Sequence, residues 1–329
     1  MKIAIIGIHI WDILIPFGWW TEKFTYNLSQ WLQKIWHEVT LFASKKSYVP
    51  DLHMICVWNS SEDEFFWEVF SHIQNWDYDV IIYSSLICKY TFDFEKYNIA
   101  FIVIFHFPIY DYLRDVLLMQ RSQNTHFVLV SRSQKTQYPQ LQNSHIIYNW
   151  VEIQKNKQVE KEDYFVWFWR ICDDKWTHIA LQACKKLNLN LKIIGKIENP
   201  LYFQTEIEPY LNTNIQYFWV CETTHLQVIV SQSQWFLFTS LWNEPFGYTI
   251  IESLTWGTPV YGFDSWAAKE ILHESVSELT SDHSVNGLMT ILENRKTFDS
   301  KVCQDYAKKH FSLEKMIDNY DSLIWETTK

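Results

Sequence analysis

Short apolar runs rich in β-branched residues alternate along this chain with helix-length segments, and that alternation constrains the fold more than any other feature. Such runs fit buried strands, and the segments between them are long enough for crossover helices. In the segment 22–35, for example, Phe24, Leu28 and Ile35 recur at helical spacing. The pattern predicts α/β layers on parallel sheets. The expected strands are Lys2–Ile6, Glu38–Phe42, Val80–Tyr83, Ala100–Phe105, His126–Val130, His145–Tyr148, Phe165–Phe168, Leu191–Ile194, Ile215–Phe218, Gln234–Phe238 and Pro259–Tyr261.

A polar, charged stretch without periodicity, Lys155–Asp163, separates the two halves and is interpreted as a linker. We therefore expect two doubly wound, Rossmann-like domains, residues 1–157 and residues 158–311. Doubly wound domains bind their ligands at the carboxyl ends of their strands, so the predicted site lies in a cleft between the two.

Composition excludes several classes of function. The net charge is −10 and no long basic run occurs, which argues against nucleic acid as a partner. The six cysteines show no Cys-x-x-Cys spacing, and neither cysteine nor histidine forms a metal-ligand pattern, so we expect reduced thiols and no metal. The first apolar run is too short for a membrane span and lacks a signal-peptide pattern, which predicts a cytoplasmic protein without integral membrane association.

The segment Glu244-Pro-Phe-Gly-Tyr-Thr-Ile-Ile-Glu252, followed by Gly257-Thr-Pro-Val260, is the most informative motif. A turn that opens a helix directs free backbone N–H groups and the positive end of the helix dipole at one point, which suits a phosphate. Glu244 would lie beside that point, and Glu252 about two helical turns further along nearly the same face. Such a site can hold a diphosphate while the two carboxylates bind sugar and ribose hydroxyls.

This segment resembles the donor-site motif of family 4 glycosyltransferases, the retaining nucleotide-sugar enzymes of the GT-B fold. The resemblance runs nearly end to end. Further motifs that carry it are Met1–Ile6, Pro16-Phe-Gly-Trp-Trp-Thr-Glu22, His37–Ser44, Phe168-Trp-Arg-Ile-Cys-Asp-Asp-Lys-Trp-Thr177, and Phe311–Met316 with Tyr320. It implies a GT-B fold in which a final helix, within residues 312–329, crosses back onto the first domain.

The resemblance also implies roles for the donor-side residues. Arg170 and Lys175 would neutralise the departing diphosphate, a task that guanidinium and ammonium groups perform without a metal. Glu252 would bind the ribose and Glu244 the transferred sugar. The backbone N–H groups of a short run would contact the sugar and the phosphates: Phe246, Gly247, Tyr248 and Thr249.

In the first domain the resemblance singles out two further places. The loop that contains Trp19 and Trp20 corresponds to one that closes on the donor phosphates, and His106 ends a strand where the family often has a histidine near the sugar and the acceptor. A lone histidine at a strand end is as readily structural as functional. Ser84 departs from the family, which frequently has another histidine at that position.

Tryptophan occurs 18 times and glycine only 7 times, whereas about 23 glycines (roughly 7%) are usual for this length. Eight tryptophans fall where the family has glycine, at positions where a turn needs positive φ or the backbone approaches a phosphate. We hypothesise that these positions are UGA codons, read as glycine by the source organism and written here as tryptophan. The eight are Trp19, Trp20, Trp36, Trp150, Trp169, Trp176, Trp219 and Trp266.

The expected function is transfer of a sugar from a nucleoside diphosphate sugar to a hydroxyl of a saccharide or small-molecule acceptor, with retention and without metal or cofactor. If the tryptophans are real, the alternative is a non-catalytic nucleotide-sugar-binding protein. A dinucleotide oxidoreductase is disfavoured because the first strand is not followed by Gly-x-Gly-x-x-Gly, even with glycine at position 11.

Overall fold

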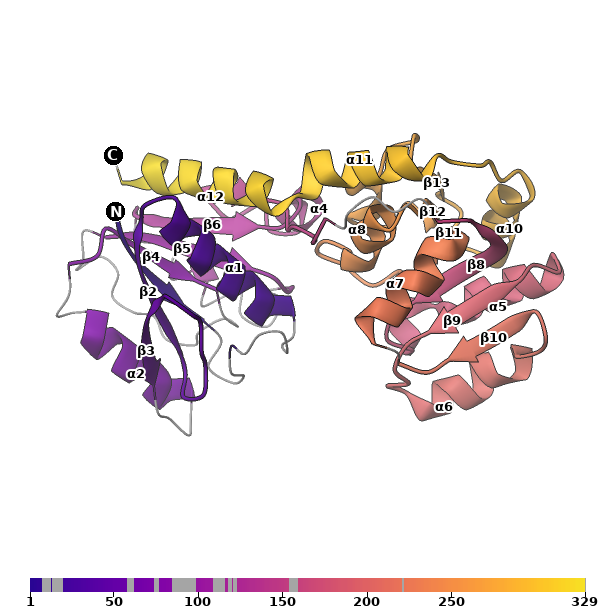
Figure 1. The fold of residues 1–329 in the computed structure, drawn as a ribbon, viewed down its shortest axis with the longest axis horizontal. Helices are drawn as coiled ribbons and strands as arrows, with labels where there is room; N and C mark the ends of the chain where they lie inside the picture. Colours follow the sequence, from indigo (N-terminus) through magenta and orange to yellow (C-terminus); the bar gives the residue numbers. More distant parts are fainter. Residues whose placement is uncertain are drawn as a thin grey trace. The chain divides into compact units, whose positions relative to one another are not determined.

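A computed structural model describes residues 1–7, 13, 20–57, 62–73, 77–84, 99–108, 116–117, 120, 123–153, 159–220 and 222–328. The chain divides into two compact units, Met1–Tyr148 with Met316–Lys329, and Asn149–Lys315. Each unit is a twisted parallel sheet with helices packed on it (Figure 1). Both units have the Rossmann-like α/β architecture that the alternating pattern predicts.

The first unit is built on a seven-stranded parallel sheet in the order β3-β2-β1-β4-β5-β6-β7. Its strands are β1 (Lys2–Ile6), β2 (Glu38–Ser44), β3 (His53–Val57), β4 (Val80–Tyr83), β5 (Ala100–Phe105), β6 (Thr125–Leu129) and β7 (Ser144–Ile146). The helices described in this unit are α1 (Trp20–Lys34), α2 (Glu62–Ile73), α4 (Arg132–Thr136) and α12 (Leu313–Thr327).

The second unit is built on a six-stranded parallel sheet in the order β10-β9-β8-β11-β12-β13. Its strands are β8 (Glu162–Phe168), β9 (Leu191–Ile194), β10 (Ile215–Phe218), β11 (Ser233–Phe238), β12 (Val260–Phe263) and β13 (Ser277–Thr280). Its α-helices are α5 (Thr177–Lys186), α6 (Pro200–Tyr202), α7 (Thr223–Gln232), α8 (Tyr248–Thr255), α9 (Ala268–Ile271), α10 (Val285–Glu293) and α11 (Ser300–Phe311), and shorter helical turns lie at η3 (Asp173–Lys175), η4 (Phe203–Ile207) and η5 (Glu208–Tyr210).

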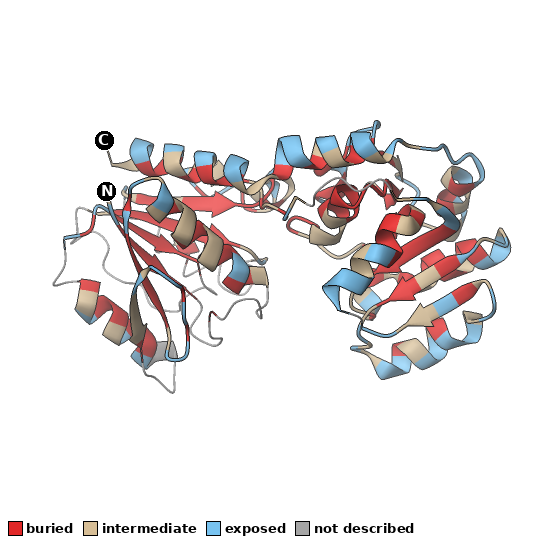
Figure 2. Cartoon of the chain, viewed as in Figure 1, coloured by how far each residue is buried: buried red, intermediate tan, exposed pale blue. Residues whose placement is uncertain are grey.

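The central strands form the buried layer of each unit (Figure 2). In the second unit, successive side chains of β8 point to opposite faces of the sheet. Trp167 packs in one core with α5 and α10, whereas Phe168 contacts Phe236 and Trp256 on the other face. Near-continuous apolar strands, such as those observed here, are the usual consequence of burying a parallel sheet on both faces.

All the predicted strands are present, although β7 ends at Ile146 rather than at residue 148. Two strands were not predicted, β3 and β13, and both lie at sheet edges. Their side chains are largely half-buried, so their sequences lack a continuous apolar run. The supposed linker is also shorter than predicted, because β8 already begins at Glu162.

The two units meet in sequence at residues 148 and 149, whereas the predicted boundary lay between residues 157 and 158. The backbone N–H of Val151 donates to Phe311 O of the second unit at 2.9 Å, which ties this stretch to α11.

The last helix returns to the first unit, as the resemblance implied. Tyr320 of α12 is fully buried, and its ring centroid lies 5.9 Å from that of Phe24 on α1. His37 Nε2 lies 2.8 Å from Asp321 Oδ1. Two segments far apart in the sequence therefore share one core.

Candidate active site

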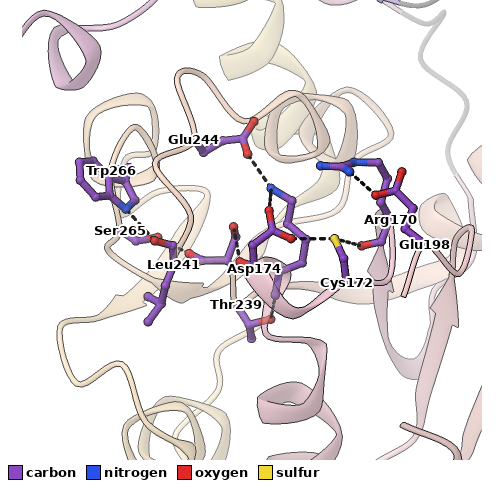
Figure 3. Close-up of polar contacts among 11 residues, drawn as sticks. Arg170, Cys172, Asp174, Glu198, Thr239, Leu241, Glu244, Ser265 and Trp266 are labelled. Carbon is purple, nitrogen blue, oxygen red and sulfur yellow. Dashed lines mark hydrogen bonds and ion pairs between the residues drawn. The ribbon is translucent and has the colours of Figure 1, made fainter. Parts of the chain in front are cut away.

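The candidate site of the second unit lies where its strand order reverses. The chain leaves β8 and passes outward to β9 and β10, while β11 pairs with β8 on its other side. Ligands of doubly wound sheets bind outside the carboxyl ends of the strands at such a switch point. Arg170 and Lys175 follow β8, and Glu244 follows β11, so three of the predicted site residues meet there (Figure 3).

Lys175 is the central cation of this site. It ends η3, and its Nζ lies 3.1 Å from Glu244 Oε2 and 3.5 Å from Asp174 Oδ2. Its backbone carbonyl accepts a hydrogen bond from Thr239 Oγ1 at 3.1 Å, just after β11. The two strand ends therefore hold the lysine in place through backbone as well as side-chain contacts.

Two indole rings enclose the Lys175 ammonium. Its Nζ lies 4.3 Å from the ring centroid of Trp169 and 4.3 Å from that of Trp242, and the side chain is only 1% exposed. Contacts of this kind stabilise a cation through the electron-rich ring faces. In the chain as written, the lysine predicted to bind diphosphate is thus sealed from solvent.

Glu244 shares this enclosure. Burial raises the pKa of its carboxyl group above the ordinary value, and the charges of Lys175 and Arg170 oppose that rise. The Lys175 contact is the reason that a carboxylate is tolerated at a side-chain exposure of 13%.

Arg170 is more open. Its side chain is 43% exposed and forms an ion pair with Glu198, on the loop that follows β9. The backbone holds this loop against the loop after β8, since Glu198 N donates to Ile171 O at 3.0 Å and Ile171 N to Lys196 O at 2.8 Å. Glu198 is therefore the anionic partner of Arg170 in this structure.

Cys172 lies among these charges but is not a nucleophile. Its Sγ donates to Asp174 Oδ1 at 2.7 Å. Burial and the Asp174 carboxylate raise the pKa of the Cys172 thiol to about 12, so the reactive thiolate does not form at neutral pH.

The predicted anion site is the start of α8, after Gly247 in the left-handed conformation (φ 87°). A side chain at this glycine would be strained by that φ and would lie 3.0 Å from Ile250 Cδ1. The first N–H groups of the helix, at Tyr248 and Thr249, have no acceptor within the helix itself. The buried Thr249 Oγ1 has no hydrogen-bond partner among the described residues.

Two further residues of this motif differ in their surroundings. Phe246 is buried, with ring centroids 5.4 Å from Tyr248 and 5.8 Å from Phe311, so its side chain packs. Glu252 lies in the second turn of α8 and is half-buried. Glu244 precedes the helix and Glu252 lies only just beyond its first turn, so the two carboxylates flank the start of α8 rather than lying two helical turns apart on one face.

In the first unit, the structure describes His106 and Trp20 and brings them together, with ring centroids 5.3 Å apart. His106 follows β5 and is also in contact with Phe24 of α1. Trp19 lies outside the described residues.

Several residues that contact the site were not predicted from the sequence. Asp174 and Trp242 lie within two residues of predicted positions, but their contacts with Lys175 depend on the conformation of the loops after β8 and β11. Glu198 gives no signal in the sequence, because its approach to Arg170 depends on how the loop after β9 packs.

Within the described residues, no group of three or more His, Cys, Asp or Glu side chains could hold a metal ion. None of the helices in the same part of the chain is long and apolar enough to cross a membrane.

Comparison with known proteins addresses the fold and the family of the second unit. Residues 149–310 match the family described as glycosyl transferases group 1. No curated protein sequence gives a significant match. HepE from Anabaena, solved in complex with UDP, is 15% identical, with 99% of this chain and 100% of that chain covered and a TM-score of 0.77.

Two further solved structures are similar over nearly their whole length. A glycosyltransferase from Rickettsia africae is 16% identical (TM-score 0.76, covering 100% of this chain and 98% of that one). AviGT4, a glycosyltransferase of avilamycin A biosynthesis, is 19% identical (TM-score 0.71, covering 99% and 98%). The fold is therefore GT-B, and the family match of the second unit supports a glycosyltransferase.

Proposed function

We propose that this protein transfers a sugar from a nucleoside diphosphate sugar to an acceptor hydroxyl, as a retaining enzyme of the family 4 type that needs no metal or cofactor. The observation that carries this proposal is the meeting of Arg170, Lys175 and Glu244 at the switch point of the unit that matches the family. Two cations from one loop suit a diphosphate that gains charge as it departs.

In the proposed reaction the bond between the anomeric carbon and the diphosphate oxygen breaks, and a bond from the acceptor oxygen forms on the same face of the sugar. Arg170 and Lys175 stabilise the diphosphate. The departing phosphate takes the acceptor proton. Glu244 binds hydroxyls of the transferred sugar, Glu252 binds those of the ribose, and the first N–H groups of α8 hold the phosphates.

We further propose that the eight tryptophans at family glycine positions are glycines in the native protein. Backbone geometry supports this at three of them. Trp36, Trp176 and Trp266 have φ of 76°, 50° and 49°, a region that costs most side chains about 1–2 kcal/mol. Elsewhere in the described chain, the non-glycine residues with positive φ are Asp51, Asn143 and Asn188, whose side chains tolerate it.

Trp169 connects the glycine proposal to the chemistry. Its ring covers one side of the Lys175 ammonium. Glycine at this position removes that ring and opens the lysine toward a phosphate, while Trp242, which family members often share, remains. Native glycine at position 169 therefore turns a sealed ion pair into an accessible binding site.

The enclosure of Lys175 also favours a second candidate function. If tryptophan at position 169 is real, the cation required by the departing diphosphate stays covered, and the protein is a non-catalytic nucleotide-sugar-binding protein. Peptide mass spectrometry of the protein from its native host decides between the two. Glycine at positions 36, 169 and 176 is expected, and tryptophan there would overturn the recoding proposal.

The activity itself is tested with the chain carrying glycine at all eight positions. We expect transfer from one of a panel of nucleoside diphosphate sugars, product of unchanged anomeric configuration by NMR, and no loss of rate with a chelator. Inverted product or chelator-sensitive transfer would contradict the mechanism. Absence of transfer with every donor would contradict the activity.

The proposed acceptor is a soluble saccharide or small molecule, since none of the helices that the structure describes suggests, as a basic amphipathic helix would, a lipid-linked acceptor. Parallel reactions with soluble acceptors and with liposomes test this choice. Transfer only in the lipid-containing reactions would refute it.

A further inference from the structure

A chain of buried hydrogen bonds leads to His106 in the first unit. Thr25 Oγ1 of α1 donates to Thr21 O at 3.0 Å and lies 3.1 Å from Ser84 Oγ, directly after β4. Ser84 Oγ lies 3.4 Å from His106 Nε2, directly after β5. Thr25 and Ser84 are both 0% exposed, so solvent does not compete for these groups.

The direction of each hydrogen bond follows from counting protons. A hydroxyl has one proton to donate, and that of Thr25 goes to a carbonyl, which can only accept. Thr25 Oγ1 must therefore accept from Ser84. The Ser84 proton is then used, and its oxygen can only accept from His106 Nε2–H. The imidazole is thus protonated at Nε2.

The other ring nitrogen of His106 is left as an acceptor. His106 Nδ1 is buried and has no hydrogen-bond partner among the described residues. Burial lowers the pKa of this imidazole to about 3, so the ring is neutral and Nδ1 carries a lone pair. A buried acceptor without a donor is costly, which points to a ligand that supplies one.

We propose that Thr25 and Ser84 are positioning residues that hold His106 as the Nε2–H tautomer, so that Nδ1 accepts a hydrogen bond from a sugar hydroxyl. The identity of the ligand rests on the proposed function, whereas the tautomer does not. Trp20, one of the proposed glycines, lies with its ring 5.3 Å from that of His106. Glycine at position 20 would remove part of the cover over the imidazole.

Selective ¹⁵N labelling of histidine in the full chain as written tests the tautomer, because protonated and unprotonated ring nitrogens have well-separated shifts. We expect a single Nε2–H tautomer for His106. Thr25→Val leaves the Ser84 proton free to turn toward Nε2, so at least half of the His106 population should become Nδ1–H. Thr25→Ser should restore the original tautomer.

Thr40→Val is the matched control. Thr40 is a buried threonine of the same sheet, and its Oγ1 lies 3.1 Å from a different histidine, at His53 Nδ1. This change should leave the His106 signals unmoved. An Nδ1–H tautomer in the parent chain, or no change with Thr25→Val, would overturn the positioning role.

Kinetics of the chain with restored glycines identify the hydroxyl. Thr25→Val should lower kcat/KM by about 5- to 20-fold, while Thr40→Val leaves it unchanged. A selective rise in the donor KM assigns the hydroxyl to the transferred sugar, and a rise in the acceptor KM assigns it to the acceptor. Unchanged kinetics with a changed tautomer would refute the hydroxyl contact. If no sugar is transferred at all, the proposed function fails, and the NMR result still decides the tautomer.

Discussion

The ion pair of Lys175 with Glu244 combines a proposed catalytic role with a structural one. Both side chains are largely buried, so removing Lys175 leaves the Glu244 carboxylate without its hydrogen-bonded cation, whereas removing Glu244 leaves Lys175 with Asp174 as its remaining carboxylate partner, at 3.5 Å. Arg170 differs, since it is exposed and its partner Glu198 lies at the surface. Substitution at the two cations should therefore affect stability differently even if both bind the same diphosphate.

Arg170→Ala is expected to lower the transfer rate of the glycine-restored chain by roughly 30- to 1000-fold, because one charge-assisted phosphate contact is lost. The melting temperature should stay within about 2 °C of the parent value, since exposed ion pairs contribute little. Lys175→Met should produce a similar loss of rate and, in addition, a loss of about 3–5 kcal/mol in stability, because one partner of a buried ion pair is removed.

The double variant Lys175→Met with Glu244→Gln tests whether the loss of stability in Lys175→Met comes from the unpaired carboxylate. It removes the uncompensated carboxylate and should recover part of the lost stability without recovering activity. Thermal unfolding and initial rates provide both readouts. A near-parental rate in either cation variant would mean that the diphosphate binds elsewhere.

Trp36 offers a test of the glycine proposal that needs no activity. It ends the turn after α1, where His37 N donates to Leu32 O at 3.1 Å, and its side chain is 93% exposed. Trp36→Gly should stabilise the protein by about 0.5–1 kcal/mol, because glycine relieves the left-handed strain and no packing is lost. Chemical denaturation measures this change.

Trp67→Gly is the matched comparison. Trp67 is also highly exposed, at 73%, but lies within α2. Glycine there should destabilise the protein by about 1 kcal/mol, as it does in helix interiors. A destabilising Trp36→Gly would contradict the assignment of this position to glycine.

At the scale of elements, the strands were predictable because each buries a continuous apolar run. The edge strands β3 and β13 were not, since half-buried sequences resemble loops. The position of Arg170, Lys175 and Glu244 after the carboxyl ends of β8 and β11 follows from their place after apolar runs, whereas the reversal of strand order at β8 is visible only in the structure. The enclosure of Lys175 by two rings and the approach of Glu198 to Arg170 depend on tertiary packing, which no local pattern encodes.

A pair of histidines on β6 and the edge strand β7 should make the stability of the first unit depend on pH. His126 Nδ1 lies 3.2 Å from His145 Nε2, and burial lowers the pKa of both rings. Lys135 opposes protonation of His145, while Glu326 of α12 favours protonation of both rings. Below about pH 6.5 the histidines of the unfolded chain bind protons that the buried rings of the folded unit do not. The free energy of unfolding is therefore unaffected by this pair above that pH and decreases as the pH falls below it.

The melting temperature of the first unit should accordingly fall between pH 7.5 and pH 5.5. His145→Asn should reduce the slope of melting temperature against pH by about half, because it removes one titrating ring and that ring's electrostatic repulsion of protonated His126. His225→Asn, at an exposed position of α7 in the second unit, serves as control. An unchanged slope in His145→Asn would show that the pair does not govern the response.

At the scale of the whole molecule, the first unit depends on a helix from the far end of the sequence. Tyr320→Ala should cost that unit about 3–5 kcal/mol, because a fully buried aromatic ring is lost from the contact with Phe24. Trp325→Ala, on the same helix and 51% exposed, should cost less than 1 kcal/mol. Hydrogen exchange resolved by peptide should locate the loss in residues 1–148 and leave β8–β13 protected; equal loosening of both units would contradict this.

The return of α12 also determines the order in which a ribosome can complete the two units. The second unit, Asn149–Lys315, has all of its elements as soon as residue 315 has emerged. The first unit begins to emerge earlier but lacks α12 until the stretch Met316–Lys329 follows. At about 5–20 residues per second, the first unit waits roughly 9–36 s with the surface around Phe24 uncovered. Of these two units, the one whose synthesis starts first is therefore the one that is completed last.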